Sequence, residues 1–265
     1  MKERIDKELV RRGLVPSRAK AQELINAGLV LLGGNIVQKA SLLVDEDDAL
    51  ELRANDRLKY VSRAGLKLDK AINEFELNFD GLKIMDIGSS TGGFCDCALR
   101  HGAKRVVAID VGTNLLHESL RADPRIDLHE QTNFKELESK YFEDIDLFVC
   151  DVSFISLKQI ILKIKQENVQ GEIVCLIKPQ FECGKKVADK YRGVILDESV
   201  HKNIANDLIA YFNSLGFYLK NMTPSPIRGG DGNIEYLAYF SNRISANEFA
   251  DPNNVIRKAF AEIKA

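Results

Sequence analysis

The sequence lacks the features that direct export or membrane insertion. No charged segment followed by an apolar one, as in a signal peptide, is present at the N-terminus. The longest apolar runs, such as residues 173–177, are far too short to span a bilayer. We therefore expect a soluble protein that makes no membrane contact.

Paired cysteines are also lacking. The chain has five cysteines, an odd number, at spacings that match neither a disulfide framework nor a zinc site. Cys95 and Cys97 are one residue apart with no second Cys/His pair nearby, so packing is favoured over metal binding. We therefore expect reduced thiols in the cytoplasm and no bound metal. The cysteines are Cys95, Cys97, Cys150, Cys175 and Cys183.

A large net charge is the third missing feature. The formal charge of −2 over 265 residues excludes a protein coated in positive charge, so nucleic-acid contact requires a local basic patch. Residues 1–20 supply one, with seven basic side chains against three acidic ones. A solvated amphipathic helix explains the same charges. Length and a hydrophobic content of 45% indicate one globular domain with a small companion.

The first 59 residues have the pattern of a small α+β module. Apolar residues recur at helical spacing in residues 5–10 and 19–25, separated by Gly13, Pro16 and Ser17. A Gly33-Gly34-Asn35 turn between short apolar segments predicts a hairpin, followed by a strand at residues 49–52. We predict a module over residues 1–59, linked through residues 57–61 to a second domain over residues 60–265.

The second domain has the pattern of an α/β fold with a mostly parallel sheet. A helix is predicted over Ser62–Phe75, with Ser62 as its N-cap. Apolar strands at residues 83–87, 106–109, 145–150 and 173–177 then alternate with polar helical stretches. Residues 217–222 and 235–240 are expected to form an antiparallel hairpin, and residues 248–264 a final helix.

A Gly- and Ser-rich loop follows the first of these strands. Its G-x-x-x-G-G spacing differs from the G-x-G-x-x-G of dinucleotide folds, and it resembles the nucleoside-methionine loop of class I (Rossmann-like) methyltransferases. Asp110 ends the next strand, where a carboxylate can accept bonds from ribose hydroxyls. A structural turn is the alternative. The predicted cofactor-binding residues are Asp86, Gly88, Ser89, Ser90, Thr91, Gly92, Gly93, Phe94 and Asp110.

Two further strand ends carry charges. Asp151 follows residues 145–150 and Lys178 follows residues 173–177, so both are expected at the ligand-binding edge of the sheet. A structural ion pair would account for them equally well. Methylation of a ribose hydroxyl needs a base, and a lysine serves when its pKa falls toward about 7–8. Lys67 and Glu235 complete a Lys-Asp-Lys-Glu set.

Several segments, in order, resemble the TlyA (haemolysin A) family of FtsJ-like ribosomal RNA 2′-O-methyltransferases. These are residues 60–68, 86–94, 151–157, 177–182 and 232–235. The resemblance implies S-adenosylmethionine as cofactor, a cytidine ribose of ribosomal RNA as substrate, and Lys67, Asp151, Lys178 and Glu235 as catalytic tetrad with Lys178 as base. Ribosomal RNA or ribosomal subunits are the implied partners.

The N-terminal module resembles the alpha-L RNA-binding motif of a small-subunit ribosomal protein and of pseudouridine synthases. Its basic side chains would contact phosphates from one helical face and position the substrate without reading bases. The predicted RNA-binding residues are Arg4, Arg11, Arg12, Arg18 and Lys20.

A few positions depart from the family pattern, and three alternative functions make different demands on the sequence. Ala40 replaces an expected proline, Gly230-Asp231 interrupts an expected Gly-Pro, and Leu196 replaces a basic residue, which bears on activity or substrate choice. An amino-group methyltransferase would carry two prolines after Asp151, and none is there. A cytolysin would need a membrane-inserting apolar segment, which is not evident. An RNA-binding protein with an inert transferase domain is the remaining alternative.

Overall fold

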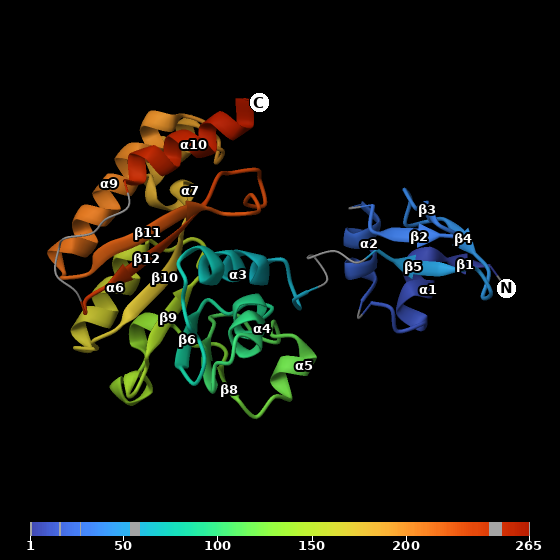
Figure 1. Ribbon diagram of the computed structural model, residues 1–265, viewed down its shortest axis with the longest axis horizontal. Helices are drawn as coiled ribbons and strands as arrows, with labels where there is room; N and C mark the ends of the chain where they lie inside the picture. Colours follow the sequence, from blue (N-terminus) through green and yellow to red (C-terminus); the bar gives the residue numbers. More distant parts are fainter. Residues whose placement is uncertain (1, 16, 27, 54–58, 244–250, 265) are drawn as a thin grey trace. The chain divides into compact units, whose positions relative to one another are not determined.

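The computed structural model describes residues 2–15, 17–26, 28–53, 59–243 and 251–264. Contacts divide the chain into two compact units, Met1–Lys59 and Tyr60–Ala265 (Figure 1). Pro16 and residues 57 and 58 of the predicted link over residues 57–61 lie outside the described residues, as do residues 248–250 of the predicted last helix.

Two helices and short strands share one core in the first unit. The helices α1 (Ile5–Arg11) and α2 (Arg18–Asn26) confirm the helical spacing of the sequence. Strands β2 (Val30–Leu32), β3 (Asn35–Ile36) and β5 (Leu50–Leu52) form an antiparallel sheet in the order β3-β2-β5, while β1 (Glu3–Arg4) pairs with β4 (Leu43–Val44). Gly33 and Gly34 both have positive φ, the conformation that a tight turn between β2 and β3 requires.

The second unit is built on a seven-stranded sheet in the order β11-β12-β10-β9-β6-β7-β8. Five strands are parallel, and β12 runs antiparallel to both β10 and β11, which confirms the predicted hairpin. The strands are β6 (Lys83–Ile87), β7 (Arg105–Ile109), β8 (Ile126–His129), β9 (Leu147–Cys150), β10 (Glu172–Ile177), β11 (Tyr218–Pro224) and β12 (Tyr236–Ser241).

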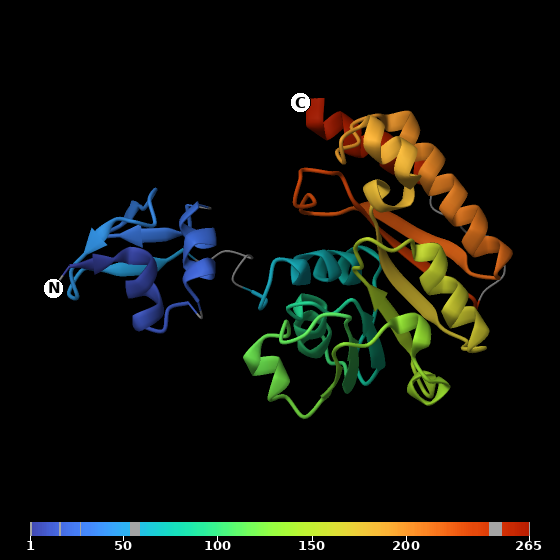
Figure 2. The same ribbon diagram turned by 180° about the vertical axis from the view of Figure 1, so that it is seen from behind.

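Helices cover both faces of this sheet (Figures 1 and 2). Alternate residues of each central strand enter opposite cores: in β10, Cys175 packs against one group of helices and Val174 against the other. One face carries α3 (Ala64–Glu74), α4 (Gly93–Arg100) and α5 (Glu118–Arg121), and the other carries α6 (Leu157–Gln166), α9 (Glu198–Ser214) and α10 (Pro252–Lys264). Shorter helices are η2 (Phe134–Glu136), η3 (Ser139–Phe142), α7 (Pro179–Glu182) and α8 (Gly184–Lys190).

Two details differ from the sequence-based expectation. No strand was expected at β8, whose four residues are all half-buried and include Asp127 and His129, so no continuous apolar run marks this edge strand. Ser62 does not cap α3, because the helix begins after Arg63 and no side chain bonds its first turn. The Ser62 hydroxyl instead lies against Gly93, at the start of α4.

All five cysteines are free thiols, and four of them are buried. Among the described residues, no helix combines the length and apolar character needed to cross a bilayer.

Candidate active site

A cavity of about 420 Å³ opens at the edge of the sheet where β6, β7, β9 and β10 end. Seven of the nine predicted cofactor-binding residues line it: Gly88, Ser89, Ser90, Thr91, Gly93, Phe94 and Asp110. Asp86 and Gly92 are not among its lining residues. The carboxyl ends of parallel strands thus form the cavity, as the sequence predicts for this fold class.

The loop after β6 requires glycine at defined positions. Gly88 has φ +83°, and a Cβ there would lie 2.9 Å from the Val152 side chain. At Gly93, the first residue of α4, a Cβ would lie 2.4 Å from the Ser62 hydroxyl and 2.8 Å from the Gly65 amide. The latter contact is with backbone, so α3 and α4 can approach this closely only without a side chain at residue 93.

The two strand-end acids of the predicted cofactor site have different environments. Asp110 lines the cavity, and its carboxylate accepts hydrogen bonds of 2.7 Å from the amides of both Ser90 and Gly112, which fixes the loop. Asp86 is fully buried and accepts a bond of 3.0 Å from the Cys95 thiol. Burial, with the nearby carboxylates of Asp151 and Asp110, raises the pKa of Asp86 to about 7.

The four predicted tetrad residues converge although they are far apart in the sequence. Lys67, on α3, contacts Asp151 and Glu235, both at 3.1 Å from its Nζ. Lys178 Nζ lies 2.6 Å from the other oxygen of Asp151. Lys67, Lys178 and Glu235 are each less than 9% exposed. The result is a continuous chain of charges, Glu235–Lys67–Asp151–Lys178, with two cations and two anions.

Asp151 is the centre of this chain. Burial alone would raise the pKa of its carboxyl, but the two lysine ammonium groups outweigh burial and hold the pKa below its ordinary value. Asp151 is therefore an anion that fixes the positions of both lysines. The register that places Tyr236 of β12 opposite Ile177 of β10 sets Glu235 beside the end of β10, where Lys178 lies.

Sequence reasoning missed three residues around the tetrad. Ser153 accepts a bond of 3.0 Å from Lys178, and Gln180 donates one of 3.1 Å to Glu235. Phe154 is 91% exposed, has φ +65°, and its ring centroid lies 4.9 Å from that of Phe181. An exposed phenylalanine in a left-handed conformation is uncommon, but only the three-dimensional structure shows its exposure and backbone angle.

A second, smaller cavity of about 170 Å³ adjoins the tetrad. Ala64, Ser153 and Lys178 line both cavities, while Lys67, Gln180 and Glu235 line only the smaller one. Lys178 is thus the tetrad lysine that faces both spaces. A ligand in each cavity would place Lys178 at their junction.

Four of the five predicted RNA-binding residues of the first unit form two groups, each held by a buried acid. Arg4 and Arg18 each contact Asp6 at 3.0 Å, and bonding to Arg4 holds the pKa of Asp6 well below its usual range. Glu8 binds Arg11 and Arg12 in the same way.

The five basic residues also differ in how much of each side chain reaches solvent. Arg12 also donates to three backbone carbonyls and is only 22% exposed, and Lys20 is 14% exposed and paired with Glu23. Arg4, Arg11 and Arg18 have 40–51% of their side chains exposed and can meet solvent or a ligand.

Comparison with known proteins agrees with this architecture. Residues 60–242 match the family FtsJ-like methyltransferase, and residues 3–50 match the S4 domain. Hemolysin A of Brachyspira hyodysenteriae is 43% identical over 240 residues, which cover 89% of this chain and 99% of that protein. The "23S rRNA (cytidine-2'-O)-methyltransferase TlyA" of Campylobacter jejuni subsp. jejuni is 38% identical over 241 residues, or 84% of this chain and 94% of that protein.

A solved structure, "Putative hemolysin from Streptococcus thermophilus", has a TM-score of 0.77 and 38% identity, and the match covers 99% of this chain and 97% of the other. The match with FtsJ-like methyltransferases covers more than half of the chain, and both relatives are matched over most of their length. The chain belongs to the FtsJ-like methyltransferases and, with its S4 domain, to the TlyA (hemolysin A) family within them.

Proposed function

We propose that this chain is an S-adenosylmethionine-dependent ribosomal RNA methyltransferase that methylates the 2′-hydroxyl of a cytidine. Family membership and the name of the Campylobacter jejuni relative support this reaction. The observation that carries the proposal is the position of Lys178, which touches Asp151 at 2.6 Å and lines both cavities.

The larger cavity fits S-adenosylmethionine in size and chemistry. Its volume of about 420 Å³ lies in the range of small-molecule sites. Val111, Leu115 and Phe134 offer apolar surface for a base, and Asp110 keeps lone pairs for ribose hydroxyls. Bound there, the cofactor supplies an electrophilic methyl carbon on a sulfonium.

The tetrad supplies the acid–base part of the reaction. In its amine form, Lys178 Nζ accepts the proton of the ribose hydroxyl, which otherwise is a poor nucleophile. Asp151 accepts a hydrogen bond from Lys178 in either charge state and so keeps the nitrogen in place. Lys67 holds Asp151 from the other side, and Glu235 and its partner Gln180 position Lys67. Placement of the two reactants at the junction of the cavities adds to the rate.

The first unit would bind the RNA substrate. Arg4, Arg11 and Arg18 present partly exposed guanidinium groups whose orientation is fixed by Asp6 and Glu8, as phosphate contacts require. A ribosomal RNA substrate supports the further proposal that the protein works in the cytoplasm, with its cysteines reduced.

The test is transfer of labelled methyl from S-adenosylmethionine to purified ribosomal subunits, followed by mapping of ribose methylation. We expect label on a cytidine 2′-oxygen and a loss of about 10²–10⁴-fold in Lys178→Ala. Lys163→Ala is the control, because Lys163 is also largely buried and paired with a glutamate, but lies on α6 away from the cavities. Label on a base, or full activity in Lys178→Ala, would overturn the proposal.

A further inference from the structure

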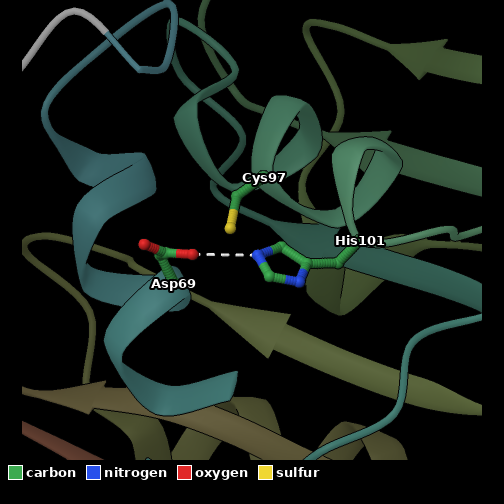
Figure 3. Close-up of side chains that lie close together, drawn as sticks. All are labelled: Asp69, Cys97 and His101. Carbon is green, nitrogen blue, oxygen red and sulfur yellow. Dashed lines mark hydrogen bonds and ion pairs between the residues drawn. The ribbon is translucent and has the colours of Figure 1, made fainter. Parts of the chain in front are cut away.

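A second cluster of reactive side chains lies outside both cavities, between α3 and α4. Asp69 comes from α3, Cys97 comes from α4, and His101 directly follows α4 as its C-cap residue (Figure 3). One potential ligand atom from each of the three residues lies within 4.8 Å of the other two. Cys97 is buried, and the other two are half-buried. The tetrad and its chemistry do not use this cluster.

Local structure accounts for the convergence. His101 caps α4 four residues after Cys97, one helical turn on, so both side chains lie on the same side of the helix. The close approach of α3 to α4 at Gly93 and Gly65 brings Asp69 opposite that face. The cluster is therefore held by two helices whose spacing is fixed by glycine contacts.

The side chains point at one place. His101 Nε2 contacts Asp69 Oδ1 at 2.9 Å. Figure 3 shows the Cys97 sulfur on the same edge of the imidazole as this contact. In a nucleophile–base–acid relay the thiol and the carboxylate would occupy opposite nitrogens of the histidine. Convergence on one nitrogen is the arrangement of ligands around a cation.

We propose that Asp69, Cys97 and His101 form a zinc site. Imidazole nitrogen, thiolate and carboxylate are the ligands of Zn²⁺, with bonds of about 2.0–2.3 Å, and three protein ligands leave a fourth position for water. Such bonds require ligand atoms roughly 3.3–3.7 Å apart. The present contacts would need to adjust by no more than about 1 Å, with the Asp69–His101 contact widening.

The charges and protons balance in this site. Cys97 gives up its thiol proton to solvent, and His101 binds through a neutral nitrogen. One thiolate and one carboxylate then neutralise the two positive charges of Zn²⁺. The Tyr60 hydroxyl donates to Asp69 Oδ1 at 2.8 Å and supplies the outer hydrogen bond that metal-binding carboxylates usually have.

Zinc would clamp two helices of the catalytic unit. Asp69 lies two residues after Lys67 on α3, and Cys97 lies on the helix that begins directly after the cofactor loop. The proposed ion would therefore fix the helix that carries one tetrad lysine against the helix that ends the loop. This link between the two helices does not depend on the methylated substrate.

The experiment uses the full chain, stripped of metal by a chelator and titrated with Zn²⁺ and Co²⁺. We expect one equivalent of zinc, a rise in melting temperature on zinc addition, and a thiolate-to-cobalt charge-transfer band with Co²⁺. Cys97→Ser should abolish the band, and His101→Gln should weaken zinc binding by at least about 10–100-fold, the loss known for outer hydrogen-bond partners. His101→Cys should retain the metal and strengthen the band through its second thiolate.

Two controls separate this site from chance binding. His129 pairs with Asp127 at 3.0 Å much as His101 pairs with Asp69, so His129→Gln should bind zinc like the wild type. Cys183→Ser removes a half-exposed thiol and should likewise have no effect. Absence of stoichiometric zinc in the wild type, or undiminished zinc and an unchanged cobalt band in Cys97→Ser, would overturn the proposal.

Discussion

Asp86 and Asp151 end neighbouring strands, yet their surroundings move their pKa values in opposite directions. Asp86 is fully buried with no cation paired to it among the described residues, so burial raises its pKa to about 7 despite the bond from Cys95. Asp151 is nearly as enclosed, but two lysines hold its pKa below the ordinary value. The nearest donors, more than burial, decide which carboxyl is an anion at neutral pH.

The elevated pKa of Asp86 predicts a pH-dependent stability. Between about pH 4, where an unfolded aspartate titrates, and about pH 7, the folded chain binds more protons than the unfolded one, so stability falls as pH rises. Asp86→Asn removes this dependence and can still accept the Cys95 bond. In urea unfolding from pH 4.5 to 8, the free energy of unfolding of the variant should rise relative to that of the wild type up to about pH 7. A pH-independent difference would contradict the assigned pKa.

The exposure of Phe154 predicts a role in substrate binding without a role in folding. Its ring contacts that of Phe181, whose centroid lies 5.8 Å from Lys178 Nζ, and the residue is 91% exposed, so a nucleobase could stack on it. Phe154→Ala should weaken RNA affinity by about 1–3 kcal/mol. Its free energy of unfolding should change by no more than about 0.5 kcal/mol. RNA-binding titrations test the first expectation, and denaturation curves test the second. Equal RNA affinity in the variant and the wild type would exclude stacking.

The contact between α3 and α4 gives a prediction at the scale of elements. A methyl group at residue 93 would meet the Gly65 backbone at 2.8 Å, so Gly93→Ala should push the two helices apart and cost about 1–3 kcal/mol of stability. Cofactor affinity should fall too, because Gly93 lines the cavity. Gly230→Ala is the control, since a Cβ there meets nothing within 4 Å. Equal melting temperatures for the two variants would show that the contact is not tight.

Sequence reasoning identified the elements whose own apolar residues follow a clear pattern. The central strands are continuous apolar runs because both faces are buried, so their ends, and with them Asp110, Asp151 and Lys178, could be placed at one edge. β8 was missed because its residues are half-buried and partly polar. Lys67 and Glu235 were selected with help from a family resemblance, since no local pattern shows that a helix and an antiparallel strand meet there.

Other features of the site depend on contacts between segments that are distant in the sequence, and residue spacing does not predict such contacts. Asp86 was expected at the cofactor, but its side chain turns toward Cys95 and lies outside the cavity lining. Cys97 is predicted as a packing residue, and it does lie in the buried core between the sheet and its helices, but the sequence does not show which polar groups lie beside it. Its neighbours are His101, one helical turn away, and Asp69 from another helix.

At the scale of the whole molecule, the proposed function assigns phosphate contacts to the first unit and methyl transfer to the second. Arg18→Ala should lower the affinity for ribosomal RNA and reduce the slope of log affinity against log salt by about 1, while the methylation rate at saturating RNA stays unchanged. Arg105→Ala is a matched control, because Arg105 has the same exposure as Arg18 and an aspartate partner, but starts β7 at the opposite edge from the cavities. An identical salt slope in Arg18→Ala would remove this arginine from the RNA contacts.

The antiparallel insertion of β12 between β10 and β11 also has a consequence for protein synthesis. Glu235, which contacts Lys67, directly precedes this late strand. A ribosome making this chain therefore carries an incomplete catalyst until residue 235 and the strand after it have emerged and inserted. If the first unit binds RNA as proposed, a nascent chain reaches RNA-binding length well before it can methylate, so premature termination would yield RNA-binding fragments without methyltransferase activity.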